Sequence, residues 1–222
     1  MIEKSTLQFL KDLSKNNNRE WFADNKSRYL AAKENAEHFA TQMVSGIREF
    51  DKTIGHLEPK DCMFRIYRDA RFSLDKTPYK TNMGIVVQRG GKKTQYSCYY
   101  VHIEPGSCFF SGGIYMPSPE VLKTLRDLID VDFEEFQEII KARSFKKYFS
   151  EIEGDSLVKV PQGFSKDSPA AEYVKMKNFY TSCAFDEKTV LSKDFLKLVL
   201  QISKSQMPLN HFFNAAIEDM EG

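Results

Sequence analysis

Hydrophobic positions before residue 51 follow the period of an α-helix. A short amphipathic helix is expected over residues 3–14. Three consecutive asparagines then interrupt it, and Asn17 with Glu20 three positions later is typical of a capping box. Apolar side chains recur at intervals of three and four residues from there on. This spacing predicts a second, long helix that ends near Asp51.

The middle of the chain changes to the alternating pattern of β-strands. Alternation of apolar and polar side chains predicts strands over residues 62–68, 83–88, 94–103 and 108–115. These four segments are expected to form an antiparallel meander.

Two glycine-containing turns connect the last three of these strands. The run Arg89-Gly90-Gly91-Lys92 is a strong hairpin signal, because glycine tolerates the positive φ of tight hairpins. Its basic tip fits either a solvated turn or a contact with phosphates. The run Glu104-Pro105-Gly106-Ser107 fits a type II turn, which has proline second and glycine third.

Helical patterns return after the meander. Ser118-Pro119 opens a helix with serine as the N-cap, and a second helix is expected over residues 132–142. The remaining elements are a short helix over residues 168–177, a strand over 179–185, and helices over 192–205 and 208–220. The sequence therefore predicts an α+β fold. Its central antiparallel sheet of about four or more strands is flanked by N-terminal and C-terminal helices, in a single domain over residues 1–222.

Composition limits the class of protein. The 222 residues carry a net charge of +1 and 41% hydrophobic residues, which is typical of a folded protein and argues against a general nucleic-acid binder. The first residues lack the basic and apolar parts of a signal peptide, and no apolar run is long enough to span a bilayer. The four cysteines match no zinc spacing and are expected to be buried free thiols in a reducing compartment. We therefore expect a cytoplasmic protein without a membrane partner.

The residues with the clearest chemical meaning lie in the segment 65–80. Its five cations and two carboxylates give a local charge of +5 − 2 = +3, against +1 for the whole chain. Arginine offers a planar fork of donors that suits carboxylate or phosphate, and lysine adds a point charge. The candidate anion-binding residues are Arg65, Arg68, Arg71, Lys76, Tyr79 and Lys80. Asp69 is a candidate to orient an arginine or to act as a catalytic base.

Three interpretations of this segment remain open. The first is a pocket, and hence an enzyme or a binding protein, for a phosphorylated or carboxylated small molecule. The second is a non-enzymatic docking module for an acidic protein or, less favoured, a nucleic acid. The third is an internal lattice of ion pairs, in which Asp69 and Asp75 neutralise the neighbouring cations. A concave site would favour the first interpretation, and a flat or convex basic face would favour the second.

His102 and Glu104 are the candidate acid–base residues of the predicted sheet. If Pro105 and Gly106 form a two-residue turn, Tyr100, His102 and Glu104 share one face, and His102 pairs with Phe109. His102 would then be a general base held by a carboxylate, or simply a half-exposed sheet residue. Nucleotide-binding, metalloprotease and serine-hydrolase motifs do not occur, so the sequence indicates no metal and leaves any cofactor unknown.

The charged segment has the form R-x-x-R-D-x-R-F-x-x-D-K-x-P-Y-K. With Asn17–Phe22, Tyr100–Gly106, Gly112–Tyr115 and Pro161–Phe164, it resembles the bacterial family called domain of unknown function 2461. The resemblance covers nearly the whole chain and implies one conserved unit. It implies no catalytic role, because we know of no established activity for that family.

Overall fold

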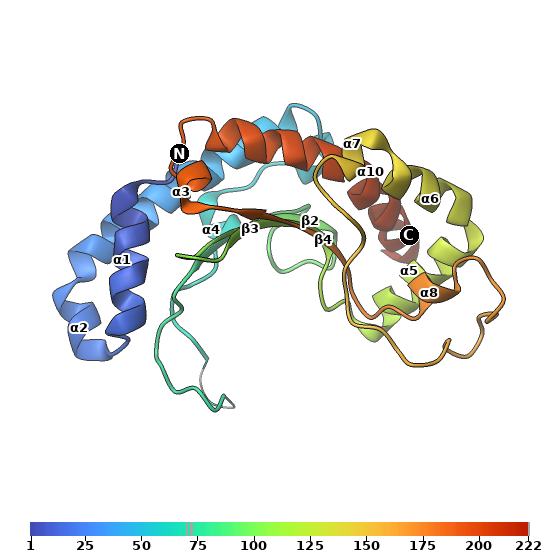
Figure 1. Ribbon diagram of the computed structural model, residues 1–222, viewed down its shortest axis with the longest axis horizontal. Coiled ribbons are helices and arrows are strands. Elements are labelled where there is room, and N and C mark those ends of the chain that lie inside the picture. Colours follow the sequence, from blue (N-terminus) through green and yellow to red (C-terminus); the bar gives the residue numbers. More distant parts are fainter. Residues whose placement is uncertain (70, 72, 222) are drawn as a thin grey trace. The chain divides into compact units, whose positions relative to one another are not determined.

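The structure is a computed structural model that describes residues 1–69, 71 and 73–221. Its helices and strands follow the α+β order predicted from the sequence (Figure 1). The elements before the sheet are α1 (Lys4–Lys15), α2 (Arg19–Asp24), α3 (Lys26–Arg48), the 3-10 helix η1 (Lys52–Ile54) and α4 (Pro59–Cys62).

The sheet has four antiparallel strands in the order β1-β2-β3-β4. The strands are β1 (Met83–Val87), β2 (Cys98–Ile103), β3 (Cys108–Ile114) and β4 (Phe179–Phe185). The other helices are α5 (Pro119–Val131), α6 (Phe133–Lys141), α7 (Arg143–Lys146), α8 (Ala171–Val174), α9 (Glu187–Val190) and α10 (Phe195–Glu221). A central antiparallel sheet with helices before and after it is thus confirmed.

The turn between β2 and β3 forms as predicted. Ser107 N donates to Glu104 O over 3.0 Å, and Gly106 has a φ of 82°. Every second residue of β2 is buried, with Tyr99, Val101 and Ile103 on the core side. Tyr100 and His102 therefore lie on the other, half-buried face.

Three element predictions were wrong at the helices. The N-cap of α2 is Asn18, whose side chain accepts from Trp21 N, and not Asn17. The long N-terminal helix is interrupted at Asn25, whose side-chain amide donates to Trp21 O over 2.9 Å and ends α2 there. The two predicted C-terminal helices are one helix, α10, with Pro208 inside it.

Two predictions in the β region were also wrong. Residues 62–68 form no strand; Cys62 ends α4, and the segment makes only single bridges, Met63 with Ile85 and Tyr67 with Tyr79. The basic turn after β1 does have glycines at positive φ, but its Lys92 is tied to α4, where its N–H donates to Asp61 O over 3.0 Å. β2 accordingly starts at Cys98 and not at residue 94.

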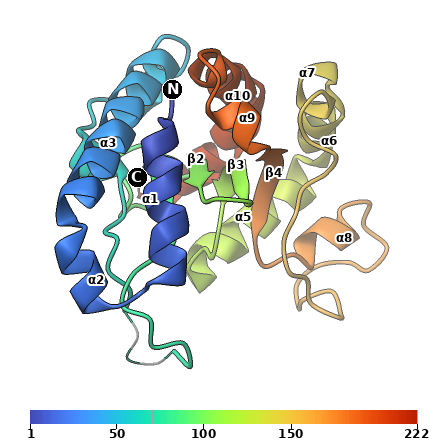
Figure 2. The same ribbon diagram turned by 60° about the vertical axis from the view of Figure 1, so that its left-hand side comes forward.

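Two compact units are distinguished within the chain. The first comprises Met1–Lys92, Tyr100–Phe110 and Ala184–Gln201, and the second comprises Lys93–Tyr99, Ser111–Cys183 and Ile202–Gly222. The prediction of a single domain stays a prediction. In the first unit α1 packs along α3 (Figure 2), and Phe39 stacks on Phe195 with ring centroids 5.3 Å apart.

Aromatic residues form the core of the second unit. Phe213 is fully buried, and its ring centroid lies 5.6 Å from that of Phe179 and 6.3 Å from that of Phe136. A buried polar series runs beside it: Thr181 donates to Gln206, and Gln206 donates to Asn210. These contacts fix the second half of α10 in its own unit.

Replacing Phe213 by alanine should lower the free energy of unfolding by about 3–5 kcal/mol, through lost transfer energy and a cavity. Chemical denaturation followed by circular dichroism measures this loss. Lys204→Ala is the matched control, because Lys204 is exposed on the same helix and should change stability by less than about 0.5 kcal/mol. Equal denaturation midpoints for both variants would contradict the packing of α10.

Candidate functional site

The charged segment folds as an irregular hairpin in the first unit. Arg68 N donates to Pro78 O over 2.9 Å, and Lys80 N donates to Ile66 O over 2.8 Å. Residues 66–68 therefore pair with residues 78–80, and the described residues between them form a loop. Ala70 and Phe72 lie outside the described residues.

Asn17 and Phe22 anchor the hairpin to the N-terminal helices. The Asn17 side chain accepts from Tyr79 N over 3.1 Å and donates to Tyr79 O over 2.9 Å. The Tyr79 ring is buried and stacks on Phe22 with centroids 3.9 Å apart. Tyr79 is thus a structural anchor whose ring position is set by packing.

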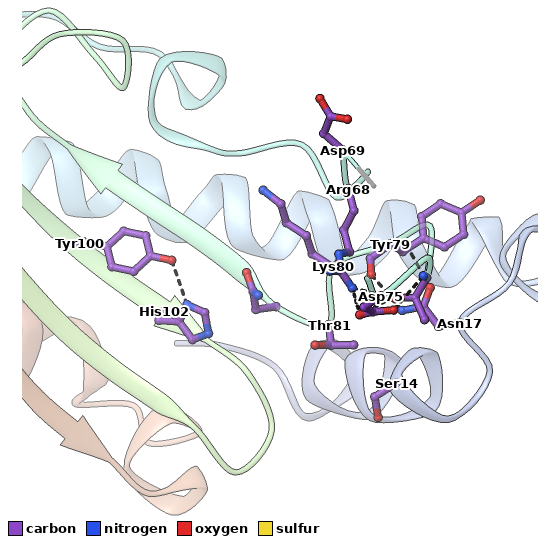
Figure 3. Close-up of a pocket in the computed structure, with 12 residues that line it drawn as sticks. Ser14, Asn17, Arg68, Asp69, Asp75, Tyr79, Lys80, Thr81, Tyr100 and His102 are labelled. Atoms are coloured by element: carbon purple, nitrogen blue, oxygen red, sulfur yellow. Dashed lines mark hydrogen bonds and ion pairs between the residues drawn. The ribbon is translucent and has the colours of Figure 1, made fainter. Parts of the chain in front are cut away.

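Arg68 is held inside the loop by side chains of the loop itself. Its guanidinium pairs with Asp75 and donates to Thr77 Oγ1 over 2.6 Å (Figure 3). Asp75 also accepts from Thr77 N over 2.9 Å. This backbone hydrogen bond, followed by the one from Arg68, lowers the pKa of Asp75 to about 2.

Asp69 and Arg71 form a second pair at the exposed end of the hairpin. Arg71 donates through Nε to one carboxylate oxygen of Asp69 over 2.9 Å and through Nη2 to the other over 2.7 Å. The hydrogen bonds from Arg71 lower the pKa of Asp69. Asp69 points away from the other labelled side chains in Figure 3.

Lys80 differs from these arginines. Its ammonium group lies 5.3 Å from the centroid of the Phe64 ring, and the described residues offer it no carboxylate within ion-pair distance. Burial, and then the charge of Arg65, lower the pKa of Lys80. Both effects act against the charged form, so an anion beside Lys80 would relieve them.

A polar hollow of about 690 Å³ opens beside Lys80. Its lining residues are Ser14, Asn17, Arg68, Asp69, Asp75, Thr77, Tyr79, Lys80, Thr81, Asn82, Tyr100 and His102. In Figure 3, Tyr100 and His102 lie on one side of Lys80, and Arg68, Asp75 and Asn17 lie on the other.

The hollow brings together only part of the residues predicted from the sequence. Arg68, Asp69, Tyr79, Lys80 and His102 belong to its lining. The other four predicted residues are not part of the lining among the residues that the structure describes; they are Arg65, Arg71, Lys76 and Glu104. The three arginines therefore do not converge on one point.

His102 has a hydrogen-bond partner on each ring nitrogen. Nδ1 lies 2.8 Å from the Tyr100 hydroxyl, and Nε2 lies 3.1 Å from Glu104 Oε2. The imidazole stacks on Phe109 with ring centroids 4.6 Å apart, as the predicted register implies. Glu104 does not line the hollow itself, but it is hydrogen-bonded to His102, which does.

Several residues of the hollow were missed as site residues. Asn17 was interpreted as a helix cap, and Tyr100 only as a residue of the sheet face. Thr81 and Asn82 follow the charged segment directly. The polar run after Lys80 is a signal in the sequence, but the contact of Asn17 with Tyr79, 62 positions away, is not.

Other kinds of site are not evident in the described part of the chain. No group of three or more His, Cys, Asp or Glu side chains there is placed to hold a metal ion. No helix in it is long and apolar enough to cross a membrane. The four cysteines are free; Cys62 and Cys108 are buried, while Cys98 and Cys183 are half-buried. Burial raises the pKa of Cys62 to about 11, which makes it a poor nucleophile.

The hydrogen bonds of Asp75 predict its titration. Its pKa of about 2 lies below the usual 3.8, so the contribution of Asp75 to loop stability is present above pH 3.8 and is lost as the pH falls towards 2. Carboxyl chemical shifts from NMR should give this midpoint. Thr77→Ala, which removes the hydroxyl but keeps the Thr77 N–H donor, should raise the midpoint less than Arg68→Gln combined with Thr77→Ala does. A midpoint near 3.8 in the wild type would contradict the loop geometry.

Comparison with known proteins places the chain in a family. A family model described as conserved hypothetical protein (DUF2461) matches residues 5–212. No functionally curated protein and no solved structure matches the chain. The family's description assigns no activity, so the function has to be argued from the hollow. The match covers nearly all of the sequence and agrees with the resemblance of the charged segment, and the chain therefore belongs to the DUF2461 family.

Proposed function

We propose that the hollow binds the anionic group of a small molecule, a phosphate or a carboxylate, and that Lys80 is its principal cation. The observation that carries this proposal is the half-buried ammonium of Lys80, which has no carboxylate partner among the described residues. A buried charge without a partner is costly, and a bound anion would supply the missing countercharge.

Arg68 supports the same anion from the loop. Its side chain is 28% exposed and lines the hollow, while Asp75 and Thr77 hold its guanidinium in place. Arginine has five N–H donors, so these contacts leave donor capacity for a ligand. The ion pairs of the loop thus act as supports for the binding cation.

The shape of the site favours a small molecule over a docking face. The residues surround a concave volume of about 690 Å³, within the range of ligand pockets. A protein or nucleic-acid partner would instead use exposed cations such as those on the hairpin. The four free cysteines further support a cytoplasmic location, where thiols stay reduced.

Inorganic phosphate should raise the melting temperature of the wild-type protein, and Lys80→Gln should remove most of that increase. Loss of the charge-assisted hydrogen bond should weaken phosphate binding by about 1.5–3 kcal/mol, or roughly tenfold or more. Thermal shift and calorimetric titration measure these effects.

Lys76→Gln is the matched control, because it removes an equal charge from an exposed lysine of the same loop that does not line the hollow. Equal losses in both variants would indicate general attraction to a basic surface, which moderate salt would abolish. That result, or no stabilisation of the wild type by any phosphorylated or carboxylated metabolite, would reject the pocket.

Anion binding should also depend on the protonation of Lys80. In the free protein the pKa of Lys80 lies below 10.5, because burial and Arg65 disfavour the ammonium. A bound anion favours the ammonium and raises that pKa, so affinity should be constant at lower pH and fall as the pH rises through the free-protein value. Titration with sulfate, which does not change its charge in this range, measures the effect. Lys80→Gln should show no such fall, and an identical fall in that variant would exclude Lys80 as its source.

A further inference from the structure

Four residues form a hydrogen-bonded series at one side of the hollow, which we call the relay: Thr81, Glu104, His102 and Tyr100. Thr81 Oγ1 donates to Glu104 Oε1, and Glu104 Oε2 lies 3.1 Å from His102 Nε2. His102 Nδ1 lies 2.8 Å from the Tyr100 hydroxyl oxygen, as the dashed line in Figure 3 marks. Tyr100 and His102 alternate on β2, so both side chains project to the same face.

Contacts outside the relay hold three of its members in position. The His102 ring lies nearly parallel to Phe109, at an interplanar angle of 14°. Glu104 belongs to the β2–β3 turn, where its backbone oxygen accepts from Ser107 N. The Tyr100 hydroxyl lies close to Gly84 of β1. If residue 84 had a side chain, its Cβ would lie only 2.6 Å from the hydroxyl oxygen. Gly84 therefore leaves the space that the hydroxyl occupies.

The partners determine how the protons are arranged. An ionised Glu104 can only accept hydrogen bonds, so His102 Nε2 carries its proton and donates to it. In the neutral imidazole, His102 Nδ1 is then the acceptor, and the Tyr100 hydroxyl donates to it. A carboxylate, an imidazole and a hydroxyl in this order are the arrangement by which an enzyme activates a hydroxyl group.

We propose that Tyr100 is the catalytic proton-transfer group of the hollow and that His102 and Glu104 act through it, a proposal that rests on the anion-binding function above. The substrate would be a small phosphorylated or carboxylated molecule with a hydroxyl group. That hydroxyl gives its proton to the Tyr100 oxygen while Tyr100 passes its own proton to His102 Nδ1. Two protons move, and the net result is one proton transferred from the substrate to His102. The imidazolium is paired with Glu104, and the negative substrate oxygen forms in the hollow that holds Lys80. The reverse sequence returns the proton to the substrate.

The anion-binding residue Lys80 and the proton-transfer residue Tyr100 line the same hollow, which supports this assignment. Tyr100, His102 and Lys80 all belong to the lining, whereas Glu104 does not. Thr81 belongs to the lining as well, so the hydroxyl groups at both ends of the relay border the hollow. A phenol hydroxyl can accept a hydrogen bond as well as donate one. A ligand whose anionic group lies at Lys80 would carry its hydroxyl towards Tyr100.

Reaction with 4-(fluorosulfonyl)benzoic acid tests the relay without knowledge of the substrate. The Tyr100 oxygen attacks the sulfur, fluoride leaves, and the phenol proton moves to His102 before it is lost to solvent. Mass spectrometry compares the labelling rates of Tyr100 and of Tyr115, which is 68% exposed and serves as the internal reference. We expect Tyr100 to react faster in the wild type, and His102→Ala to slow its reaction by about a hundredfold without affecting Tyr115.

Two further variants test whether slower labelling in His102→Ala comes from loss of the relay or from a general loss of structure. Glu104→Gln keeps a hydrogen-bond acceptor but removes the charge, and it should slow the labelling of Tyr100 at an unchanged melting temperature. Gly84→Ala keeps all four relay residues but displaces the hydroxyl, and it should have a similar effect. The 15N NMR signals of the neutral His102 ring should place its proton on Nε2. A proton on Nδ1, or equal labelling of Tyr100 in the wild type and in His102→Ala, would overturn the proposal.

The outcomes separate the relay from the anion pocket. If phosphate raises the melting temperature but the labelling of Tyr100 does not depend on His102, the relay is wrong and the pocket stands. If labelling depends on His102 but phosphate neither stabilises the protein nor protects Tyr100, the assignment of Tyr100 to an anionic substrate is overturned together with the pocket.

Discussion

Backbone pairing of residues 66–68 with residues 78–80 is the constraint on which the candidate site depends. It closes the charged loop, so Arg68 lies within reach of Asp75 and Thr77. The same pairing presents the backbone of Tyr79 to Asn17 and its ring to Phe22. Both Tyr79 and the next residue, Lys80, line the hollow, Tyr79 from a buried position and Lys80 from a half-buried one.

The loop has features of both the ion-pair lattice and the anion pocket, which the sequence analysis treated as alternatives. Asp69 neutralises Arg71, and Asp75 neutralises Arg68, as an internal lattice of ion pairs would require. Exposed pairs of this kind contribute little to stability, so their main effect is to fix the loop geometry. Lys80 is excluded from the lattice and is partly desolvated. The site thus depends on one cation that the neighbouring pairs leave without a countercharge.

Local sequence signals predicted much of the fold. The turn at Pro105-Gly106, the N-cap at Ser118 and the strand β4 all occur where the pattern placed them. The errors arose where tertiary contacts override local preference. α10 continues through Pro208, at a local cost of about 3 kcal/mol, because buried residues on both sides of the proline, such as Ile202 and Phe212, hold the helix in place.

The site was predictable as a cluster but not as a geometry. The charge density of residues 65–80 identified the segment, and the turn register placed His102 opposite Phe109. The pairing of Arg68 with Asp75 and of Arg71 with Asp69 depends on the path of the loop. The strand predicted over residues 62–68 gave a different path. The roles of Asn17 and Gly84 depend on contacts across 62 and 16 positions, which no local pattern contains.

The central claim is that an anion occupies the hollow beside Lys80. A crystal structure of the protein grown with phosphate tests it most directly, because it locates the ion and its partners together. We predict an ordered phosphate with an oxygen about 2.7–3.2 Å from Lys80 Nζ, on the side of the hollow that Tyr100 faces. A hollow filled by water alone at saturating phosphate, or phosphate bound only to exposed cations such as Arg71, would contradict the claim.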